Sequence, residues 1–178
     1  MKASPEEKQK VGGVIIAEDN SKTRTFLKNQ LELLGYEVIG AVNNGKDAVE
    51  LAADTEPGLI ILDIKMPTMD GIEAARGISS TRSVPIILIT GHHSDEMAAK
   101  AIEAGVFGYL VKPITKKQLK PAITLAMVRY HEFSSLKAEV SDLREAVETR
   151  KLVEKAKGIL MKRCNISEED AFKLLQAH

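Results

Sequence analysis

The chain has 178 residues, 44% hydrophobic and 28% charged, which suits one domain of ordinary size and a smaller second unit. Its 25 basic and 25 acidic residues balance, so the whole protein has no bulk attraction for nucleic acid or for a membrane surface. The single cysteine, Cys164, excludes an internal disulfide and a cysteine-built zinc site, and it fits a reducing cytoplasm. No apolar run approaches the roughly 20 residues that a membrane span needs.

The polar N-terminus, residues 1–12, is expected to be a flexible tail, and it is followed by short apolar runs that alternate with helical patterns. In chain order the sequence predicts a strand at 13–17, a helix at 21–34, a strand at 36–42, a helix at 44–53, a strand at 59–63, a helix at 72–78, a strand at 84–89, a helix at 94–104 and a strand at 107–111. A fifth helix begins after Thr115.

This alternation predicts an α/β fold, a doubly wound parallel sheet with helices on both faces. Right-handed crossovers favour the strand order 2-1-3-4-5, in which the first and third strands are neighbours. The first strand is followed by Glu18 and Asp19, and the third ends at Asp63. The predicted order therefore brings three carboxylates together at the carboxyl edge of the sheet, where ligands bind in such folds.

The residues at four strand ends together suit phosphoryl chemistry. Three crowded carboxylates raise one another's pKa unless a cation shares the site, and their hard oxygen atoms suit Mg²⁺. An ionised Asp63 can then act as a nucleophile and form an aspartyl phosphate. Thr90 and Lys112, at the ends of the fourth and fifth strands, offer a hydroxyl and a flexible cation to a phosphoryl group. Taken alone, Asp63 could equally cap the next helix.

The fifth helix shows no breaker until Gly158, apart from Pro121, which removes one helical hydrogen bond and can kink the helix. Its apolar residues follow heptad spacing, with charged residues between them, at Phe133, Leu136, Val140, Leu143 and Val147. This spacing predicts a coiled coil with a partner helix. The alternative is an amphipathic helix that lies on its own domain.

The last segment is basic and helical. Six basic residues and one acid lie between Arg150 and Arg163. This helix ends at Asn165, and a capping box at residues 167–170 starts a final helix at 168–177. The basic run would attract phosphate in a salt-dependent way, whereas the simpler reading is a solvated helix face.

Residues 13–130 resemble the receiver domain of two-component response regulators. The resemblance rests on the acidic pair, the segment LDIKMPTMDG that begins at Leu62, the hydroxyl of Thr90 and the segment YLVKP that ends at Pro113. It implies a flavodoxin-like domain that a sensor histidine kinase phosphorylates on Asp63, and a cis peptide bond before Pro113. The implied Mg²⁺ ligands are Glu18, Asp19, Asp63 and the backbone carbonyl of Lys65, and the implied switch residues are Thr90, Tyr109 and Lys112. The Glu-Asp pair departs from the family, in which Asp-Asp is commoner.

Residues 150–178 resemble the ANTAR domain, a small helical RNA-binding module of antiterminator regulators, through the segments AKGILM at 156–161 and ISEEDAFKLL at 166–175. The resemblance implies binding to RNA hairpins. With the basic run it gives five candidate RNA-binding residues, Lys155, Lys157, Gly158, Lys162 and Arg163. The family has three helices, and the third is absent from this sequence, which stops at His178.

The two resemblances predict a receiver domain at 13–130, a coiled-coil linker at 131–149 and a small all-α output domain at 150–178. The expected function is that of a cytoplasmic, non-enzymatic response regulator whose phosphorylation controls transcription antitermination. Its expected partners are a histidine kinase, RNA and a second copy bound through the coiled coil and the fifth helix, with no membrane partner. The alternative is a phosphorylation-controlled dimeric interaction module that binds no nucleic acid. A phosphatase of the haloacid dehalogenase type is disfavoured, because Lys65 stands where that class has a second acid.

Overall fold

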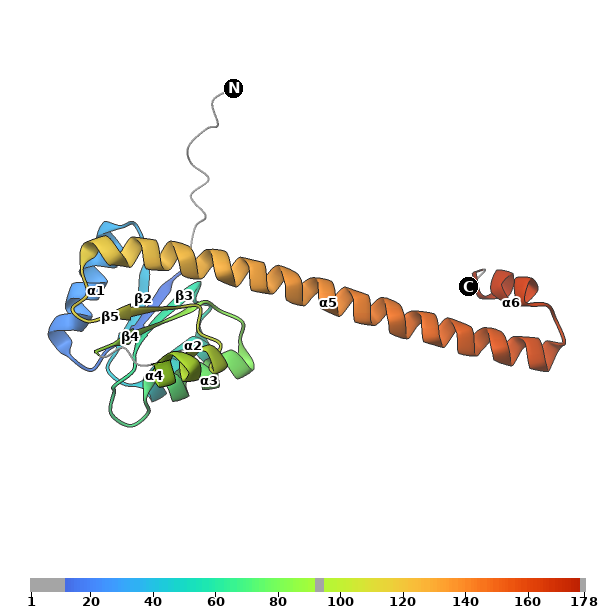
Figure 1. Cartoon of the computed structure of the whole chain (residues 1–178), viewed down its shortest axis with the longest axis horizontal. Helices are drawn as coiled ribbons and strands as arrows, with labels where there is room; N and C mark the ends of the chain where they lie inside the picture. Colours follow the sequence, from blue (N-terminus) through green and yellow to red (C-terminus); the bar gives the residue numbers. More distant parts are fainter. Residues whose placement is uncertain (1–11, 92–94, 177–178) are drawn as a thin grey trace, which may run out of the picture. The chain divides into compact units, whose positions relative to one another are not determined.

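The computed structural model describes residues 12–91 and 95–176 (Figure 1). The expected flexible tail lies, except for its last residue, outside the described residues, and so does Ser94, the expected start of the fourth helix. By its internal contacts the chain divides into two units, residues 1–131 and 132–178, which are taken in turn below.

The first unit is built on a five-stranded parallel sheet with the order β2-β1-β3-β4-β5, which confirms the predicted topology. Its strands are β1 (Val14–Ala17), β2 (Val38–Val42), β3 (Leu59–Asp63), β4 (Ile86–Thr90) and β5 (Gly108–Val111). β4 begins two residues later than predicted, directly after Pro85, which has no N–H group to donate to a neighbouring strand. β1 and β3 pair residue for residue, with Ala17 opposite Leu62, so the residues that follow them are neighbours.

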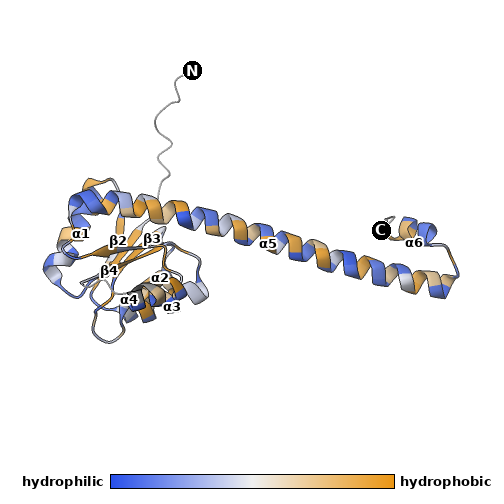
Figure 2. Cartoon of the chain, viewed as in Figure 1, coloured by the Kyte–Doolittle hydropathy of each residue, from blue (hydrophilic) through white to orange (hydrophobic). Residues whose placement is uncertain are grey.

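Helices cover both faces of this sheet (Figure 1). They are α1 (Ser21–Leu33), α2 (Gly45–Asp54), α3 (Gly71–Thr81), α4 (Asp95–Glu103) and the first part of α5 (Lys116–Cys164). Alternate residues of the central strands face opposite sides: Ile60 and Leu62 pack with α2, α3 and α4, and Leu59 and Ile61 pack with α1 and α5. The central strands β1, β3 and β4 are therefore apolar up to their carboxyl ends, as the hydrophobic colour in Figure 2 shows, because both of their faces are buried.

The α3 helix is longer than the sequence pattern indicated, starting at Gly71 and ending at Thr81. Its N-cap is Asp70, whose side chain accepts hydrogen bonds from the backbone N–H groups of Ile72 and Glu73 at 2.8 Å each. The Glu73 side chain accepts in return from the Asp70 backbone N–H, which completes a capping box. The Asp70-Gly71 pair therefore starts the helix one residue earlier than the predicted start at 72.

The second unit contains the rest of α5 and the short helix α6 (Glu168–Gln176). As predicted, α5 continues through Pro121 and Gly158, and it ends just before Asn165, whose φ of 50° lies in the left-handed region that asparagine tolerates. Ser167 accepts a hydrogen bond from the Asp170 N–H at 3.2 Å, as a helix cap does. Among the described residues no helix, α5 included, is both long and apolar enough to cross a membrane.

Candidate functional site

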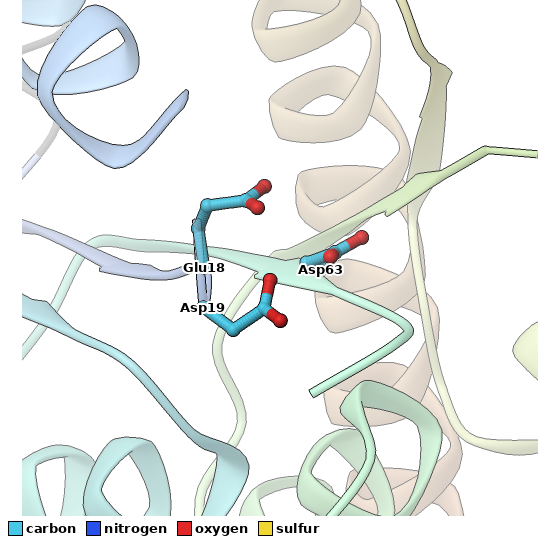
Figure 3. Close-up of side chains that lie close together, drawn as sticks. All are labelled: Glu18, Asp19 and Asp63. Carbon is cyan, nitrogen blue, oxygen red and sulfur yellow. The ribbon is translucent and has the colours of Figure 1, made fainter. Parts of the chain in front are cut away.

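Three carboxylates meet at the carboxyl edge of the sheet (Figure 3). Glu18 and Asp19 directly follow β1, and Asp63 is the last residue of β3. One oxygen atom from each of the three lies within 4.8 Å of the others. Glu18 and Asp63 are buried, with 0% and 3% of their surface exposed, whereas Asp19 is exposed. The site thus consists of two buried carboxylates, Glu18 and Asp63, and the solvent-exposed carboxylate of Asp19.

Lys112, the residue directly after β5, supplies the positive charge of this site. Its Nζ donates a hydrogen bond to Asp63 Oδ2 at 2.9 Å and another to Glu18 Oε1 at 3.1 Å. The same Nζ lies 2.9 Å from Glu18 Oε2, but this buried oxygen accepts no well-aligned hydrogen bond from the described residues. The peptide bond between Lys112 and Pro113 is cis, as the resemblance implied.

Burial and charge act against each other at this site. Burial raises the pKa of Glu18, and the negative charge of Asp63 adds to that rise, while the hydrogen bond from Lys112 opposes it. For Lys112, burial lowers the pKa, but hydrogen bonds to Asp63 and Glu18 and their charges outweigh it, so its pKa is raised. Lys112 is therefore fully charged at neutral pH, and it holds the two buried carboxylates together.

The donor set fits a hard divalent cation. Three carboxylates face one ammonium group, which leaves an excess of negative charge when all are ionised. The buried Glu18 Oε2 is in ionic contact with Lys112 Nζ at 2.9 Å but accepts no aligned hydrogen bond, so it keeps the capacity to bind a cation. Oxygen ligands with one exposed member, Asp19, match the preference of small divalent ions that keep several water ligands.

Of the three remaining predicted residues of this region, Thr90 and Lys65 lie at the same edge of the sheet, and Tyr109 lies nearer the start of β5. Thr90 is the last residue of β4 and is buried, 6% exposed. Tyr109 lies in β5 with half of its surface exposed. Lys65 is an exposed residue two positions beyond Asp63. The hydroxyl and the backbone carbonyl that the resemblance assigns to Thr90 and Lys65 therefore come from the carboxyl edge of the sheet, whereas the ring of Tyr109 starts from within β5.

Arg24 was not among the predicted site residues, yet it holds the loop that carries the acidic pair. From the first turns of α1 its guanidinium donates hydrogen bonds to the backbone carbonyls of Glu18 at 2.6 Å and Asp19 at 3.3 Å. Asn20 caps the same helix and donates its N–H to Glu18 Oε1 at 3.3 Å. An arginine in the first turn of the helix that follows an acidic pair is the signal that could have revealed this role.

Gly71, the first residue of α3, lies against the end of β3. Its N–H donates to the Ile64 carbonyl at 2.9 Å, and it is buried. A Cβ atom here would overlap the carbonyl oxygen of Asp63 and approach Ile64 Cα to 3.0 Å. Both neighbours are backbone atoms of the segment that carries the carboxylate, so a side chain at this position cannot be accommodated by a rotamer change.

We therefore expect Gly71→Ala to lower the free energy of unfolding by about 1–3 kcal/mol, because overpacking forces the backbone to move. Urea denaturation of the full chain measures this change. The matched control is Gly77→Ala in the same helix, where the new Cβ would meet only the side chain of Val49, at 3.5 Å and 3.9 Å. That variant should be neutral or gain up to about 1 kcal/mol, as helix propensity predicts. Equal effects of the two substitutions would contradict the role given to Gly71.

In the second unit, Lys157 ties α5 to α6. It is only 8% exposed, and its Nζ lies 2.9 Å from Glu154 Oε1 and 2.6 Å from Glu168 Oε1. The hydrogen bond with Glu168 and then that with Glu154 raise the pKa of Lys157, and the same ammonium lowers the pKa of Glu168. Its positive charge is thus matched by two acids of its own unit.

The other candidate RNA-binding residues differ from Lys157 in exposure. Lys155, Lys162 and Arg163 are exposed, and Gly158 is half-buried, with open space where a Cβ would lie. Among the described residues these three basic side chains form no ion pair within the unit. They are consequently available to an anionic partner.

Residues 14–124 match the family of response regulator receiver domains, and residues 141–178 match the ANTAR domain family. The transcriptional regulatory protein PdtaR of Mycobacterium tuberculosis is 45% identical to this chain over 163 residues, which cover 92% of this chain and 80% of PdtaR.

Two solved structures show the same likeness for the first unit. The signal receiver domain of a modulated diguanylate cyclase from Desulfovibrio desulfuricans G20 has a TM-score of 0.62 at 36% identity, and the match covers 68% of this chain and 97% of that domain. A two-component response regulator of the LuxR family from Aurantimonas has a TM-score of 0.62 at 28% identity, covering 66% of this chain and 86% of that structure.

Proposed function

This chain belongs to the response regulators that join a receiver domain to an ANTAR domain, and from this membership we propose that phosphorylation of Asp63 by a sensor histidine kinase controls RNA binding by the C-terminal unit. The observation that carries the proposal is the buried Asp63 carboxylate, hydrogen-bonded to Lys112 and grouped with Glu18 and Asp19. In this proposal residues 13–130 are the input domain, 131–149 the dimerising linker and 150–178 the output domain. The protein then acts in the cytoplasm, where RNA is transcribed, as a regulator and not as an enzyme.

In the phosphoryl transfer, an Asp63 carboxylate oxygen attacks the phosphorus atom of a phosphohistidine. An oxygen–phosphorus bond forms as the nitrogen–phosphorus bond breaks, and the imidazole leaves. Glu18, Asp19, Asp63 and the backbone carbonyl of Lys65 would hold Mg²⁺, which supplies positive charge for the phosphoryl oxygens when bound. Lys112 already lies 2.9 Å from Asp63 Oδ2, so its ammonium can follow the carboxylate to the phosphoryl group.

The new phosphoryl group adds about −1.5 to −2 charges at the end of β3. We propose that Thr90 and Lys112 respond by contacting its oxygen atoms and that Tyr109, half exposed in β5, changes its position with them. The Lys112 ammonium must then give up part of its bonding to Glu18, because it donates to both carboxylates in the structure described above. This exchange of partners is the local event that biases the receiver domain.

The proposed output is RNA binding through Lys155, Lys162 and Arg163, which are exposed near the end of α5. We assign Lys157 a supporting role, because its ammonium is buried and held by two acids. Gly158 would let the RNA backbone approach α5 where no side chain stands in the way. With few aromatic residues to stack on bases, recognition would rest on charge and on the shape of hairpins. The ANTAR match disfavours the alternative of an interaction module that binds no nucleic acid.

Phosphorylation should tighten binding of the full chain to hairpin RNA about tenfold, a typical coupling between two sites of one protein. The experiment compares mobility shifts of a panel of hairpins with protein treated with acetyl phosphate and Mg²⁺ and with untreated protein. The control is a duplex of the same length without a loop, for which no change is expected. Equal affinity of both protein forms for every hairpin would contradict the coupling of input and output.

A further inference from the structure

Within the second unit, α5 carries an apolar stripe and, beside it, a row of basic side chains. Figure 2 shows hydrophobic and hydrophilic residues interspersed along this part of the helix. The apolar stripe is the predicted heptad pattern, and each of its residues is about half exposed or more, Phe133, Leu136, Val140, Leu143 and Val147. The basic row starts at Lys137 and recurs 7, 14, 18 and 25 residues later, at Arg144, Lys151, Lys155 and Lys162. Because an α-helix turns by about 100° per residue, these five cations lie within about 40° of one another around the helix axis.

The acidic residues of α5 lie away from this basic row. Residues 132–163 contain six of them, and the same helical geometry places five at least about 60° from the row. The sixth, Glu148, borders the row and lies 2.7 Å from Lys151 Nζ. The row is therefore a band of one charge sign, with a single acid at its side.

A solvated helix face is the simpler explanation of such a band, and the ion pairs of the chain argue against it. Exposed lysines on other helices bind a glutamate one turn away, at 3.9, 3.8 and 2.8 Å in the pairs Lys28–Glu32, Lys46–Glu50 and Lys173–Glu169. By contrast, Lys137, Lys155 and Lys162 have no acid three or four residues away in either direction. Arg144 has only Glu148, which binds Lys151 instead. Over the described residues of the second unit, four of the five cations thus form no ion pair.

The length of the row indicates which kind of anion it fits. From Lys137 to Lys162 the helix rises by about 37 Å, whereas Lys155 and Lys162 alone span only about 10 Å. Over about 37 Å, one strand of a nucleic acid duplex presents on the order of ten phosphates, roughly 3.4 Å apart. A base-paired stem offers such a regular series of charges, and proteins bind double-stranded RNA largely through its phosphates and its shape. A long straight row of cations therefore matches the stem of a hairpin.

We propose that the RNA-binding surface extends beyond residues 150–178 along α5, and that Lys137, Arg144 and Lys151 bind the phosphates of the hairpin stem. The inference rests on the proposed function, in which the C-terminal unit binds hairpin RNA, and it adds three contacts and a dependence on stem length. Lys151 exchanges the carboxylate of Glu148 for a phosphate when RNA binds, so its net gain is smaller than that of Lys137 or Arg144. Contacts to phosphates carry no sequence information, so these residues select for the length of the stem and not for its bases.

Two hairpins with the same loop and with stems of about 4 and about 14 base pairs test this extension. The loop is that of the most tightly bound hairpin of the panel described above, and the full chain is treated with acetyl phosphate and Mg²⁺. Wild-type protein should bind the long stem about tenfold or more tightly than the short one. Replacing Lys137, Arg144 and Lys151 together by alanine should weaken binding to the long stem about 10- to 100-fold and make its slope of log K against log salt concentration shallower by about 2. Binding to the short stem should not change. Fluorescence anisotropy at four salt concentrations measures these quantities.

Two control variants separate position from charge. Replacing Lys116, Lys117 and Lys120 by alanine removes the same three charges from exposed positions at the start of α5, and this variant should bind both hairpins as wild type does. The charge-conserving variant Lys137→Arg with Arg144→Lys and Lys151→Arg should keep the preference for the long stem.

The outcomes distinguish this inference from the proposed function. Wild-type affinity of the triple alanine variant for the long stem would overturn the extension and leave RNA binding by residues 150–178 standing. An equal loss on both stems with a lower sedimentation coefficient would also overturn it, because the variant would then have lost dimerisation. If the variant instead lost affinity only for a polyglutamate peptide, the basic row would serve an acidic protein partner and not RNA. Failure of wild-type protein to bind either hairpin would overturn the proposed function, and this inference with it.

Discussion

The Asp63→Asn variant is expected to take up only background label from radioactive acetyl phosphate in the presence of Mg²⁺. In the proposed reaction of the wild-type protein, an Asp63 oxygen attacks the phosphorus atom, the bond to the acetyl oxygen breaks and acetate leaves. An uncharged amide lacks the nucleophilic oxygen and weakens the cluster that would bind Mg²⁺. The alkali-labile phosphoryl group on the full chain is measured after gel filtration at fixed reaction times.

The matched control is Asp54→Asn, a change of the same chemistry at the exposed last residue of α2. It should label as wild type does. Equal labelling of Asp63→Asn and wild type would remove Asp63 as the phosphoacceptor and with it the proposed input.

The same variant has a predictable pH dependence of stability. The pKa of Glu18 is raised above 4.5 in the folded state, first by burial and also by the Asp63 charge, so the folded protein binds a proton more readily than the unfolded chain. The stability that this proton contributes is present below pH 4.5 and is lost as the pH rises through the folded pKa. Because Asp63→Asn removes one cause of the shift, urea denaturation should show a smaller loss over this pH range. An unchanged pH profile would contradict the electrostatic coupling of Glu18 and Asp63.

The second large effect concerns RNA. Replacing Lys155, Lys162 and Arg163 together by alanine is expected to weaken hairpin binding about 100-fold at roughly 0.1 M salt, if each side chain neutralises one phosphate. The slope of log K against log salt concentration should become shallower by about 2 for the three lost contacts. Fluorescence anisotropy of a labelled hairpin, titrated at four salt concentrations, measures both quantities.

Two further variants give this experiment its controls. Lys173→Ala removes an exposed lysine that is bound to Glu169 on α6 at 2.8 Å, and it should leave the salt slope unchanged. Lys157→Met should loosen the packing of α6 on α5, seen as faster amide hydrogen exchange in α6, since Glu154 and Glu168 lose their shared cation. If Lys157→Met instead made the slope of log K against log salt concentration shallower, while the amides of α6 stayed protected from hydrogen exchange, Lys157 would be an RNA contact.

The sheet and its site could be predicted because both follow from short-range signals. In an alternating α/β pattern, a short apolar run that ends in a polar residue, such as Leu59–Asp63, indicates a buried strand. The strand order then places the polar residues at the strand ends along one edge of the sheet, Glu18, Asp19, Asp63, Thr90 and Lys112. Chain order thus determined which polar residues meet. The distances were not predictable, because the reach of Lys112 to both carboxylates depends on side-chain rotamers and on the path of the backbone after β5.

What could not be predicted depends on contacts between backbones or on pairs distant in sequence. The requirement for glycine at position 71 appears only when the start of α3 is seen against the Asp63 carbonyl. Lys157 is buried because the chain reverses direction at Asn165, so that α6 packs on α5 and brings Glu168 next to Lys157. In sequence Lys157 looks like its neighbour Lys155, since both are lysines in a basic helical run. Composition alone cannot separate a structural lysine from one that is available to RNA.

The half-exposed stripe on α5 has a consequence for how the regulator responds to its own abundance. Helices with few tertiary contacts are only marginally stable in water, and in the proposed dimer a second chain would cover the exposed residues of this stripe. Anything that binds only the folded form stabilises it by mass action, so the order of this segment depends on protein concentration. A cell that makes more of the protein then raises the fraction of paired output units even at a constant level of phosphorylation. The amount of protein and its level of phosphorylation would therefore both set the position of the monomer–dimer equilibrium.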